Sequence, residues 1–343
     1  MQDVSARQCV STVMMVRPCS FGYNVDAAQS NAFMHEEDKE SSKINGLAEK
    51  EFDNLVSKLR AEGVEVYVFQ DTLVTHTPDS IFPNNWFDTD SEGMAILYPM
   101  CPENRRLERE KNFLQDLTKY GFVINKYTDL TSYEKKGKFL EGTGSLVFDC
   151  ISKVAYTCLS PRTHRDLIPE FEKYTGYTTV KFYAYDKNGA PIYHTNVIMA
   201  IGDKFAVLCP EAIRSGEERA RVLESLRNTG REIIEISPDQ VEQFCGNILQ
   251  IRNIYGGLLI VMSETAYNGF TIEQKNALGR FGKLIYAPIP TIEYYGGGSV
   301  RCMIAEIFLP RVEKQRTIKV PKKTMIEKSK SLISTASQSP PLA

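Results

Sequence analysis

Residues 296–308, GGGSVRCMIAEIF, join a glycine run to the last apolar strand-like segment of the chain. Four earlier segments have the same form, a polar or glycine-containing turn followed by an apolar run: FPNNWFD (82–88), EGTGSLVFD (141–149), YHTNVIMAIG (193–202) and CGNILQIRN (245–253). The fifth segment ends the predicted folded region. We therefore expect it to pair back with the first strand of the chain, residues 12–16, so that no long sheet edge stays exposed.

Each segment belongs to a repeated unit of three strands and one helix. A second apolar strand comes next, and its five copies are TVMMVRP (12–18), MAILYPMCP (94–102), VAYTCLSP (154–161), FAVLCP (205–210) and LLIVMSE (258–264). An amphipathic helical stretch, a glycine and a third strand follow; the glycines are Gly63, Gly121, Gly176, Gly230 and Gly282, which lie 52–58 residues apart. A constant period of this length indicates a repeat architecture, and a glycine just after a helix favours closure of its last turn.

Local signals place the helices. Ser215 with Glu218, and Thr271 with Gln274, have the spacing of capping boxes, which predicts a helix start at each. Residues 47–59 carry apolar side chains at helical spacing. The polar stretch 36–45 before them is predicted to be a surface loop.

The fold class predicted from these units is α/β, as a five-bladed α/β propeller with pseudo-fivefold repeats and a ring closed by the two termini. The repeats are approximately 11–70, 81–128, 139–184, 191–237 and 245–290, with 296–309 closing the first, all in one catalytic domain over 1–310. The even period and the lack of a linker argue against two tandem domains. Residues 311–343 carry eight Lys/Arg and two Glu, which predicts a basic, disordered tail.

Composition excludes several function classes. The formal net charge is −2, so no global electrostatic attraction to nucleic acid or to an anionic membrane is expected. No apolar run is long enough for a bilayer, and the start of the chain has no secretory h-region, which predicts a cytoplasmic protein. The eight cysteines form no Cys-x-x-Cys pair, so we expect neither a disulfide framework nor a metal site. A free cysteine remains as a candidate nucleophile.

The repeat brings chemically active residues to corresponding positions. The polar residues that open the first strand of each unit are Asn84 and Asn85, Glu141, His194 and Asn196, Asn247, and Arg301 and Cys302. Equivalent positions of a closed propeller converge at one end of its axis. One thiol, one imidazole, one carboxylate and several amides at these positions are typical of nucleophilic catalysis.

The phrases FPNNW, FLEGTG, LSPRT, YHTNV, GNIL and GGGSVRCMIAEIFLP occur in this order. They resemble those of the guanidine-modifying (arginine deiminase, dimethylarginine hydrolase and amidinotransferase; pentein) superfamily, most closely its citrulline utilization hydrolase branch, over about residues 11–310. The resemblance implies a pentein fold, Cys302 as nucleophile, His194 as acid and base, and Glu141 as the carboxylate that orients His194 and binds substrate nitrogen. It implies a small-molecule substrate and no metal or organic cofactor, and it leaves a homo-oligomer open.

Two departures from the deiminase pattern point to the substrate. Deiminase-type relatives carry Phe-x-Arg-Asp where this chain has Phe82, Pro83, Asn84 and Asn85, and Asn196 stands where they typically have Asp. A buried carboxylate facing a neutral group would be desolvated without compensation, whereas an amide can both accept and donate hydrogen bonds. The asparagines therefore favour the neutral ureido group of citrulline.

A carboxylate partner completes the predicted site. Arg162, in LSPRT, resembles the family arginine that binds the substrate α-carboxylate, since a guanidinium binds carboxylate bidentately; Arg105, Arg106 and Arg17 are weaker candidates. Asn84, Asn85, Asn196, Arg162 and Arg301 are thus the predicted substrate-binding residues.

Three alternatives remain at this stage. The same three catalytic residues could serve an arginine deiminase or a dimethylarginine hydrolase. A second amine could resolve the thioester, which would make the protein a transferase. A non-catalytic pentein that only binds its ligand is the alternative of another class.

Overall fold

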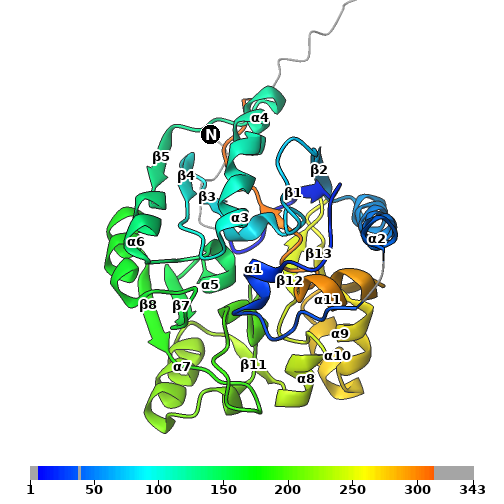
Figure 1. Cartoon of the computed structure of the whole chain (residues 1–343). Coiled ribbons are helices and arrows are strands. Elements are labelled where there is room, and N and C mark those ends of the chain that lie inside the picture. Colours follow the sequence, from blue (N-terminus) through cyan, green and yellow to red (C-terminus); the bar gives the residue numbers. More distant parts are fainter. Residues whose placement is uncertain (1–6, 38–39, 313–343) are drawn as a thin grey trace, which may run out of the picture.

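The structure, a computed structural model, describes residues 7–37 and 40–312 (Figure 1). Most of the predicted basic tail, from residue 313 on, lies outside the described residues. Within them the strands form five three-stranded sheets. They are β15 (Ala305–Glu306) with β1 (Thr12–Arg17) and β2 (Glu65–Gln70); β3 (Phe87–Thr89) with β4 (Met94–Leu97) and β5 (Lys126–Asp129); β6 (Val147–Asp149) with β7 (Val154–Cys158) and β8 (Thr178–Phe182); β9 (Met199–Ile201) with β10 (Phe205–Leu208) and β11 (Glu232–Glu235); and β12 (Leu249–Arg252) with β13 (Leu258–Ser263) and β14 (Lys283–Ala287).

All five sheets share one topology. The middle strand runs antiparallel to the first and parallel to the third. The predicted pairing of the last segment with the first strand is confirmed, because β1 pairs with β15 through Val13 opposite Glu306 and Met14 opposite Ala305. Figure 1 shows the units following one another around the molecule in sequence order. The fold is thus mixed α/β with small sheets, and the closed five-bladed propeller stays a prediction.

Four units connect their second and third strands through one main helix or helix pair, as the amphipathic pattern predicts. These helices are α2 (Ser41–Ala61), α6 (Ile168–Thr175), α7 (Gly216–Asn228), and α9 (Glu264–Gly269) with α10 (Ile272–Gly279). The second unit differs and has four short turns, α3 (Glu103–Arg106), η2 (Leu107–Lys111), α4 (Phe113–Asp116) and η3 (Leu117–Tyr120). Asn112 interrupts this series, because its left-handed backbone (φ 57°) cannot continue a helix. Arg105 and Glu108 of these turns are buried.

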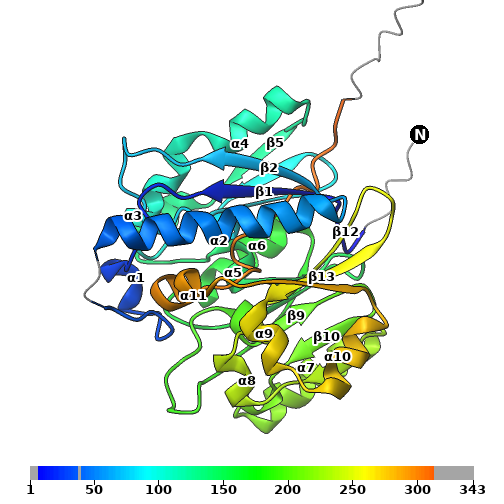
Figure 2. The same cartoon turned by 90° about the vertical axis from the view of Figure 1, so that its right-hand side faces the viewer.

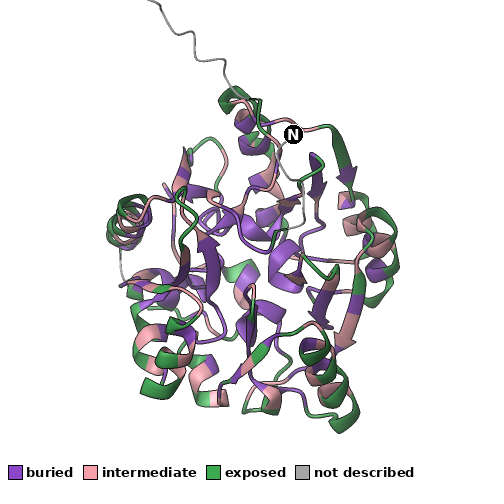
Figure 3. Ribbon diagram, turned by 180° about the vertical axis from the view of Figure 1, so that it is seen from behind, coloured by how far each residue is buried: buried purple, intermediate pink, exposed green. Residues whose placement is uncertain are grey.

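The core lies on the strands and on the inner faces of the helices. Figure 3 shows the buried ribbon gathered at the centre and the exposed ribbon on the outer helices. In α2 the buried residues include Phe52, Leu55, Val56 and Leu59, as their helical spacing predicts. Figure 2 shows α2 lying along β1 and β2, and it also contacts β14 and α11 (Pro290–Gly296) of the last unit. The helix thus joins the first and last units.

Several local expectations were wrong. Helix α2 begins at Ser41 and not after the stretch 36–45, because Ile44 and Ala48 extend its buried face. The third strand of the second unit, expected from residue 122, begins at Lys126; Phe122 pairs instead with Arg311. Gly282 lacks the positive φ of the other four glycines; a Cβ there would lie 2.9 Å from the carbonyl oxygen of Leu258, so close packing requires it.

The two predicted capping boxes have different outcomes. The box formed by Thr271 and Gln274 is confirmed. Ser215 caps its helix by accepting from the backbone N–H of Glu218, but the carboxylate of Glu218 accepts from the backbone of Tyr183 instead of closing the box. None of the described helices is long and apolar enough to cross a bilayer.

Candidate active site

Several of the predicted site residues lie in or at the start of short helical turns just before the first strand of a unit. Asn84 and Asn85 are in η1 (Pro83–Asn85), Glu141 is the N-cap of α5 (Gly142–Ser145), and His194 is the N-cap of η6 (Thr195–Val197). The expectation that His194 and Asn196 open the first strand of their unit was wrong, because Asn196 lies within η6 and β9 begins only at Met199. The hydroxyl of Thr195 donates to the carbonyl of Ser145 at 2.6 Å, which ties this turn to α5.

Glu141 is a fully buried carboxylate with three partners. Its Oε2 lies 2.8 Å from Nε2 of His194 and 3.4 Å from Nη1 of Arg162, and its Oε1 accepts from the backbone N–H of Cys101 at 2.8 Å. Burial alone raises a carboxyl pKa, but Arg162 and His194 hold the pKa of Glu141 well below its usual range. Glu141 is therefore an ionised group whose charge is already balanced inside the protein.

His194 is held as a neutral imidazole. Burial disfavours the charged imidazole and lowers its pKa, although the hydrogen bond to Glu141 acts in the opposite direction. The carboxylate can only accept, so Nε2 carries the proton and Nδ1 carries the lone pair. Nδ1 has no hydrogen-bond partner among the described residues, and it is the atom available to take a proton.

The thiol of Cys302 lies among amide groups. The Nδ2 atoms of Asn247 and Asn196 lie 3.3 and 3.6 Å from its Sγ, and the side chain is 5% exposed. Amide N–H groups stabilise a thiolate, the form in which cysteine attacks. In the part of the chain that the structure describes, no hydrogen bond joins Cys302 to His194.

The other seven cysteines are protonated, unreactive thiols. Burial raises the pKa of each, and the residues are Cys9, Cys19, Cys101, Cys150, Cys158, Cys209 and Cys245. A raised pKa keeps a thiol protonated and inert.

Asn84 and Asn85 are both buried, and each has one amide atom without a partner. Nδ2 of Asn84 donates to Oγ1 of Thr143 at 3.1 Å, and its Oδ1 has no partner. Oδ1 of Asn85 accepts from Nη1 of Arg105 at 2.7 Å, and its Nδ2 has no partner. Unpaired buried polar atoms are rare in native proteins and call for an explanation.

The glycines of EGTG permit the contact between η1 and α5. A Cβ on Gly142 would lie 2.6 Å from the carbonyl oxygen of Asn84. A Cβ on Gly144 would lie 2.5 Å from Nδ2 of Asn85 and 2.7 Å from Nδ1 of His194. Any larger residue would therefore collide with the site, and the amide of Asn85 and the imidazole of His194 are neighbours across Gly144.

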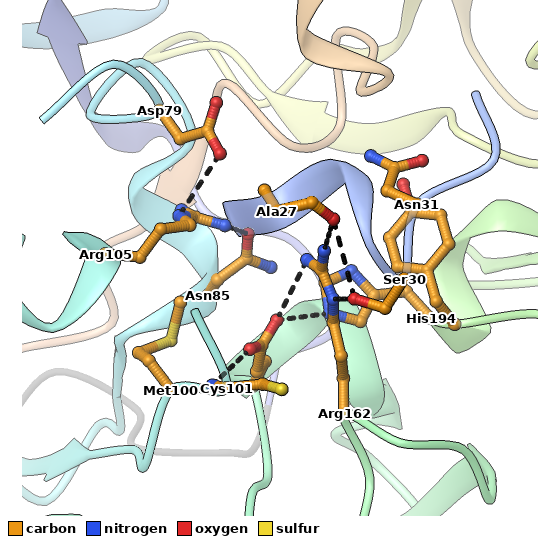
Figure 4. A network of polar contacts seen from close by, with 12 residues as sticks. Ala27, Ser30, Asn31, Asp79, Asn85, Met100, Cys101, Arg105, Arg162 and His194 are labelled. Carbon is orange, nitrogen blue, oxygen red and sulfur yellow. Dashed lines mark hydrogen bonds and ion pairs between the residues drawn. The ribbon is translucent and has the colours of Figure 1, made fainter. Parts of the chain in front are cut away.

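The two predicted arginines are committed to protein partners. Arg162 donates to the carbonyl of Ala27 at 2.6 Å and to the hydroxyl of Ser30 at 2.8 Å, besides its contact with Glu141 (Figure 4). The guanidinium of Arg301 donates to the carboxylate of Glu306 at 2.8 Å. Arg301 also lines a cavity of about 100 Å³, together with Asn84 and Asn196.

The structure gives Arg105 a larger part in the site than the sequence predicts. The sequence pattern groups it with Arg106 and Arg17 as a weaker carboxylate partner, but Arg105 is 3% exposed and hydrogen-bonded to Asn85. Arg106 bonds the carbonyls of Met100 and Cys101, and Arg17 pairs with Asp53 and Glu49. The pattern in the sequence gave no signal that separates these three.

Comparison with known proteins places this arrangement among relatives. A family model described as N,N dimethylarginine dimethylhydrolase, eukaryotic, matches residues 17–309. No curated protein matches the chain. The arginine dihydrolase ArgZ of the cyanobacterial ornithine-ammonia cycle is 15% identical with a TM-score of 0.67, over 88% of this chain and 41% of that protein. The chain thus spans about two fifths of the length of ArgZ.

Two further structures match over almost their whole length. The N-terminal domain of ArgZ, covalently bound to a reaction intermediate, is 17% identical with a TM-score of 0.66 and covers 87% of this chain and 99% of that one. A dimethylarginine dimethylaminohydrolase, as an adduct with S-methyl-L-thiocitrulline, is 14% identical with a TM-score of 0.59 over 86% and 99%. At these identities the likeness establishes the fold.

Proposed function

Because the chain belongs to the eukaryotic N,N dimethylarginine dimethylhydrolase family of the guanidine-modifying pentein superfamily, we propose that it hydrolyses the ureido C–N bond of citrulline. The products are ornithine, ammonia and carbon dioxide. The reaction class, hydrolysis of a C–N bond in an arginine-like compound, agrees with the family. The choice of citrulline as the substrate rests on the charges of the site.

The observation that carries this choice is the charge balance of the site. The side chains at 84 and 85 are buried neutral amides, and the carboxylate of Glu141 already pairs with the guanidinium of Arg162. Positions 84 and 85 supply no carboxylate to balance a substrate guanidinium, and the buried carboxylates of Asp79 and Glu108 lie against Arg105. Desolvation of the guanidinium would cost several kcal/mol. A neutral ureido group needs only hydrogen bonds, which amides supply.

The proposed reaction begins at Cys302. Nδ1 of His194 takes the thiol proton, the thiolate attacks the ureido carbon, and the amide groups of Asn84 and Asn85 hold the ureido nitrogen and oxygen. His194 then gives its proton to the departing ornithine nitrogen, leaving a carbamoyl thioester on Cys302. His194 next takes a proton from water, which attacks the thioester. The C–S bond then breaks, His194 returns the proton to the Cys302 thiolate, and the released carbamic acid decomposes to carbon dioxide and ammonia.

The same proposal assigns supporting roles. Glu141 fixes the tautomer of His194 through the 2.8 Å hydrogen bond. Arg162 is proposed to bind the α-carboxylate, and to do so it must exchange its contact with Ala27 or Ser30 for the substrate. Asn196 and Asn247 stabilise the thiolate by N–H donation. Arg301 is proposed to add positive charge near the substrate, although its guanidinium faces Glu306.

A guanidino substrate is the second candidate. The names of the matching family and of the neighbouring structures refer to arginine and dimethylarginine. Such a substrate would use the same nucleophile and base but would lack the carboxylate that deiminase-type relatives carry at the position of Asn85.

The test is ornithine and ammonia release by the purified protein, with citrulline, arginine and dimethylarginine assayed side by side. We expect citrulline to be the preferred substrate and Cys302→Ala to be inactive, while Cys158→Ala, which removes another buried thiol, retains activity. Preferential turnover of arginine or dimethylarginine would refute the citrulline assignment. An active Cys302→Ala variant would refute the nucleophile.

A further inference from the structure

We infer that Arg105 and Thr143 are positioning residues that fix the rotation of the Asn85 and Asn84 amides, so that the site presents one donor and one acceptor to the substrate head. The inference rests on the proposed function. It names the feature that would select a ureido group over a guanidinium, and it starts from the two unpaired amide atoms.

The orientation of Asn85 follows from the chemistry of its partner. Arginine has donors and no acceptor, so the oxygen of the amide must face Nη1 of Arg105, as it does at 2.7 Å. Arg105 is itself immobile, because it makes two hydrogen bonds to the carboxylate of Glu108, at 2.8 and 3.1 Å, and one to the carbonyl of Phe82 at 2.9 Å. Figure 4 shows the nitrogen of Asn85 turned away from Arg105. That nitrogen is thus a fixed donor beside His194.

The orientation of Asn84 is fixed in the opposite sense. The hydroxyl hydrogen of Thr143 is used on the backbone carbonyl of Asn84 at 3.1 Å, so Oγ1 can only accept from the side chain of Asn84. The nitrogen of the amide therefore faces Thr143, and the buried oxygen is left as a fixed acceptor. Two adjacent amides thus present different atoms.

A ureido head matches this pair. It carries N–H groups for the oxygen of Asn84 and a carbonyl oxygen for the nitrogen of Asn85. A guanidinium carries only N–H groups, so its contact with Asn85 would set donor against donor. An unsatisfied buried donor of this kind reduces binding by about 10- to 100-fold.

The test compares matched variants at each position. Thr143→Val removes the hydroxyl and lets Asn84 rotate, whereas Thr143→Ser keeps the hydroxyl. Arg105→Lys replaces the planar guanidinium by a point charge. Its control is Arg109→Lys, because Arg109 is largely buried and ion-paired with Glu134 but does not contact the asparagines. Thermal unfolding monitors the fold of all four.

We expect Thr143→Val and Arg105→Lys to lower the citrulline-to-arginine ratio of kcat/KM by about 10-fold or more. Thr143→Ser should keep most of the discrimination, and Arg109→Lys all of it. Equal ratios in Thr143→Val and Thr143→Ser, together with equal ratios in the two lysine variants, would overturn the inference.

A binding measurement separates this inference from the proposed reaction. Calorimetry with Cys302→Ala measures the affinities for citrulline and arginine without turnover. Preference for citrulline in a protein whose native form releases no ornithine would refute the reaction and keep the amide orientations. Tighter binding of arginine, or binding of neither, would overturn the orientations even if the native protein hydrolyses citrulline.

Discussion

Substitution of Gly144 by alanine tests the geometry of the site without changing any reacting group. The new methyl carbon would lie 2.5 Å from Nδ2 of Asn85 and 2.7 Å from Nδ1 of His194, nearly 1 Å short of ordinary van der Waals contact. Neither neighbour can yield freely, because Arg105 holds Asn85 and Glu141 holds His194. The backbone of Gly144 has no positive φ, so the substitution adds steric pressure without backbone strain.

A displacement of this size has a predictable cost. Misplacing a reacting group by about 1 Å lowers the rate about 100-fold, and overpacking of a close-packed interior costs about 1–3 kcal/mol of the free energy of unfolding. We therefore expect Gly144→Ala to fold with reduced stability and to lose about 100-fold in kcat/KM. The assay is initial-rate measurement with the preferred substrate, accompanied by denaturant unfolding.

The control is Gly216→Ala, since a Cβ at Gly216, the first residue of α7, would meet no atom within 4 Å. Its activity should equal that of the native protein. If Gly144→Ala retained activity within threefold of Gly216→Ala, the close approach of Asn85 and His194 across Gly144 would be wrong as a description of the working site.

Three further predictions concern charge, protonation and helix stability. Glu141→Gln leaves the buried guanidinium of Arg162 without its counter-charge and should lower the free energy of unfolding by about 3–5 kcal/mol, measured by denaturant titration. Burial lowers the pKa of His194 to about 4, so the base stays neutral as the pH falls below 6.5; the acid limb of the kcat/KM profile should lie below pH 6, and a limb at 6.5 or above would contradict this. Gly46→Ala, inside α2 and with open space around its Cβ, should raise the free energy of unfolding by about 0.5–1 kcal/mol, and no gain in a melting experiment would count against it.

Most of the strands could be predicted from local pattern, and the contact between Glu141 and His194 from their equivalent places in the repeat. An apolar run bounded by glycine and proline predicts a strand wherever it occurs, and a constant period places equivalent turns together. The helical turns before the first strands could not be predicted in this way. Asn196 was placed on a strand because three residues of η6 have no periodicity, and their position depends on the bond from Thr195 to Ser145.

The partners of the arginines depend on tertiary contacts that sequence spacing does not record. Arg105 lies 20 residues from Asn85 and 3 from Glu108, and it reaches both from α3, the first short turn of the second unit. Arg162 meets Ala27, which lies 135 residues earlier in the chain. Motif reading identified Arg162 but could not show that its donors are engaged.

The contact between Arg162 and Glu141 gives the strongest physical reason for a neutral substrate head. An isolated buried carboxylate would attract a cation, but here the cation belongs to the protein, and the pKa of Glu141 is lowered accordingly. A guanidinium substrate would have to displace this internal pair or remain uncompensated beside two amides. A ureido group neither displaces the ion pair nor brings an uncompensated charge, because hydrogen bonds satisfy its dipoles. The discrimination proposed for this site therefore resides as much in Arg162 as in the two asparagines.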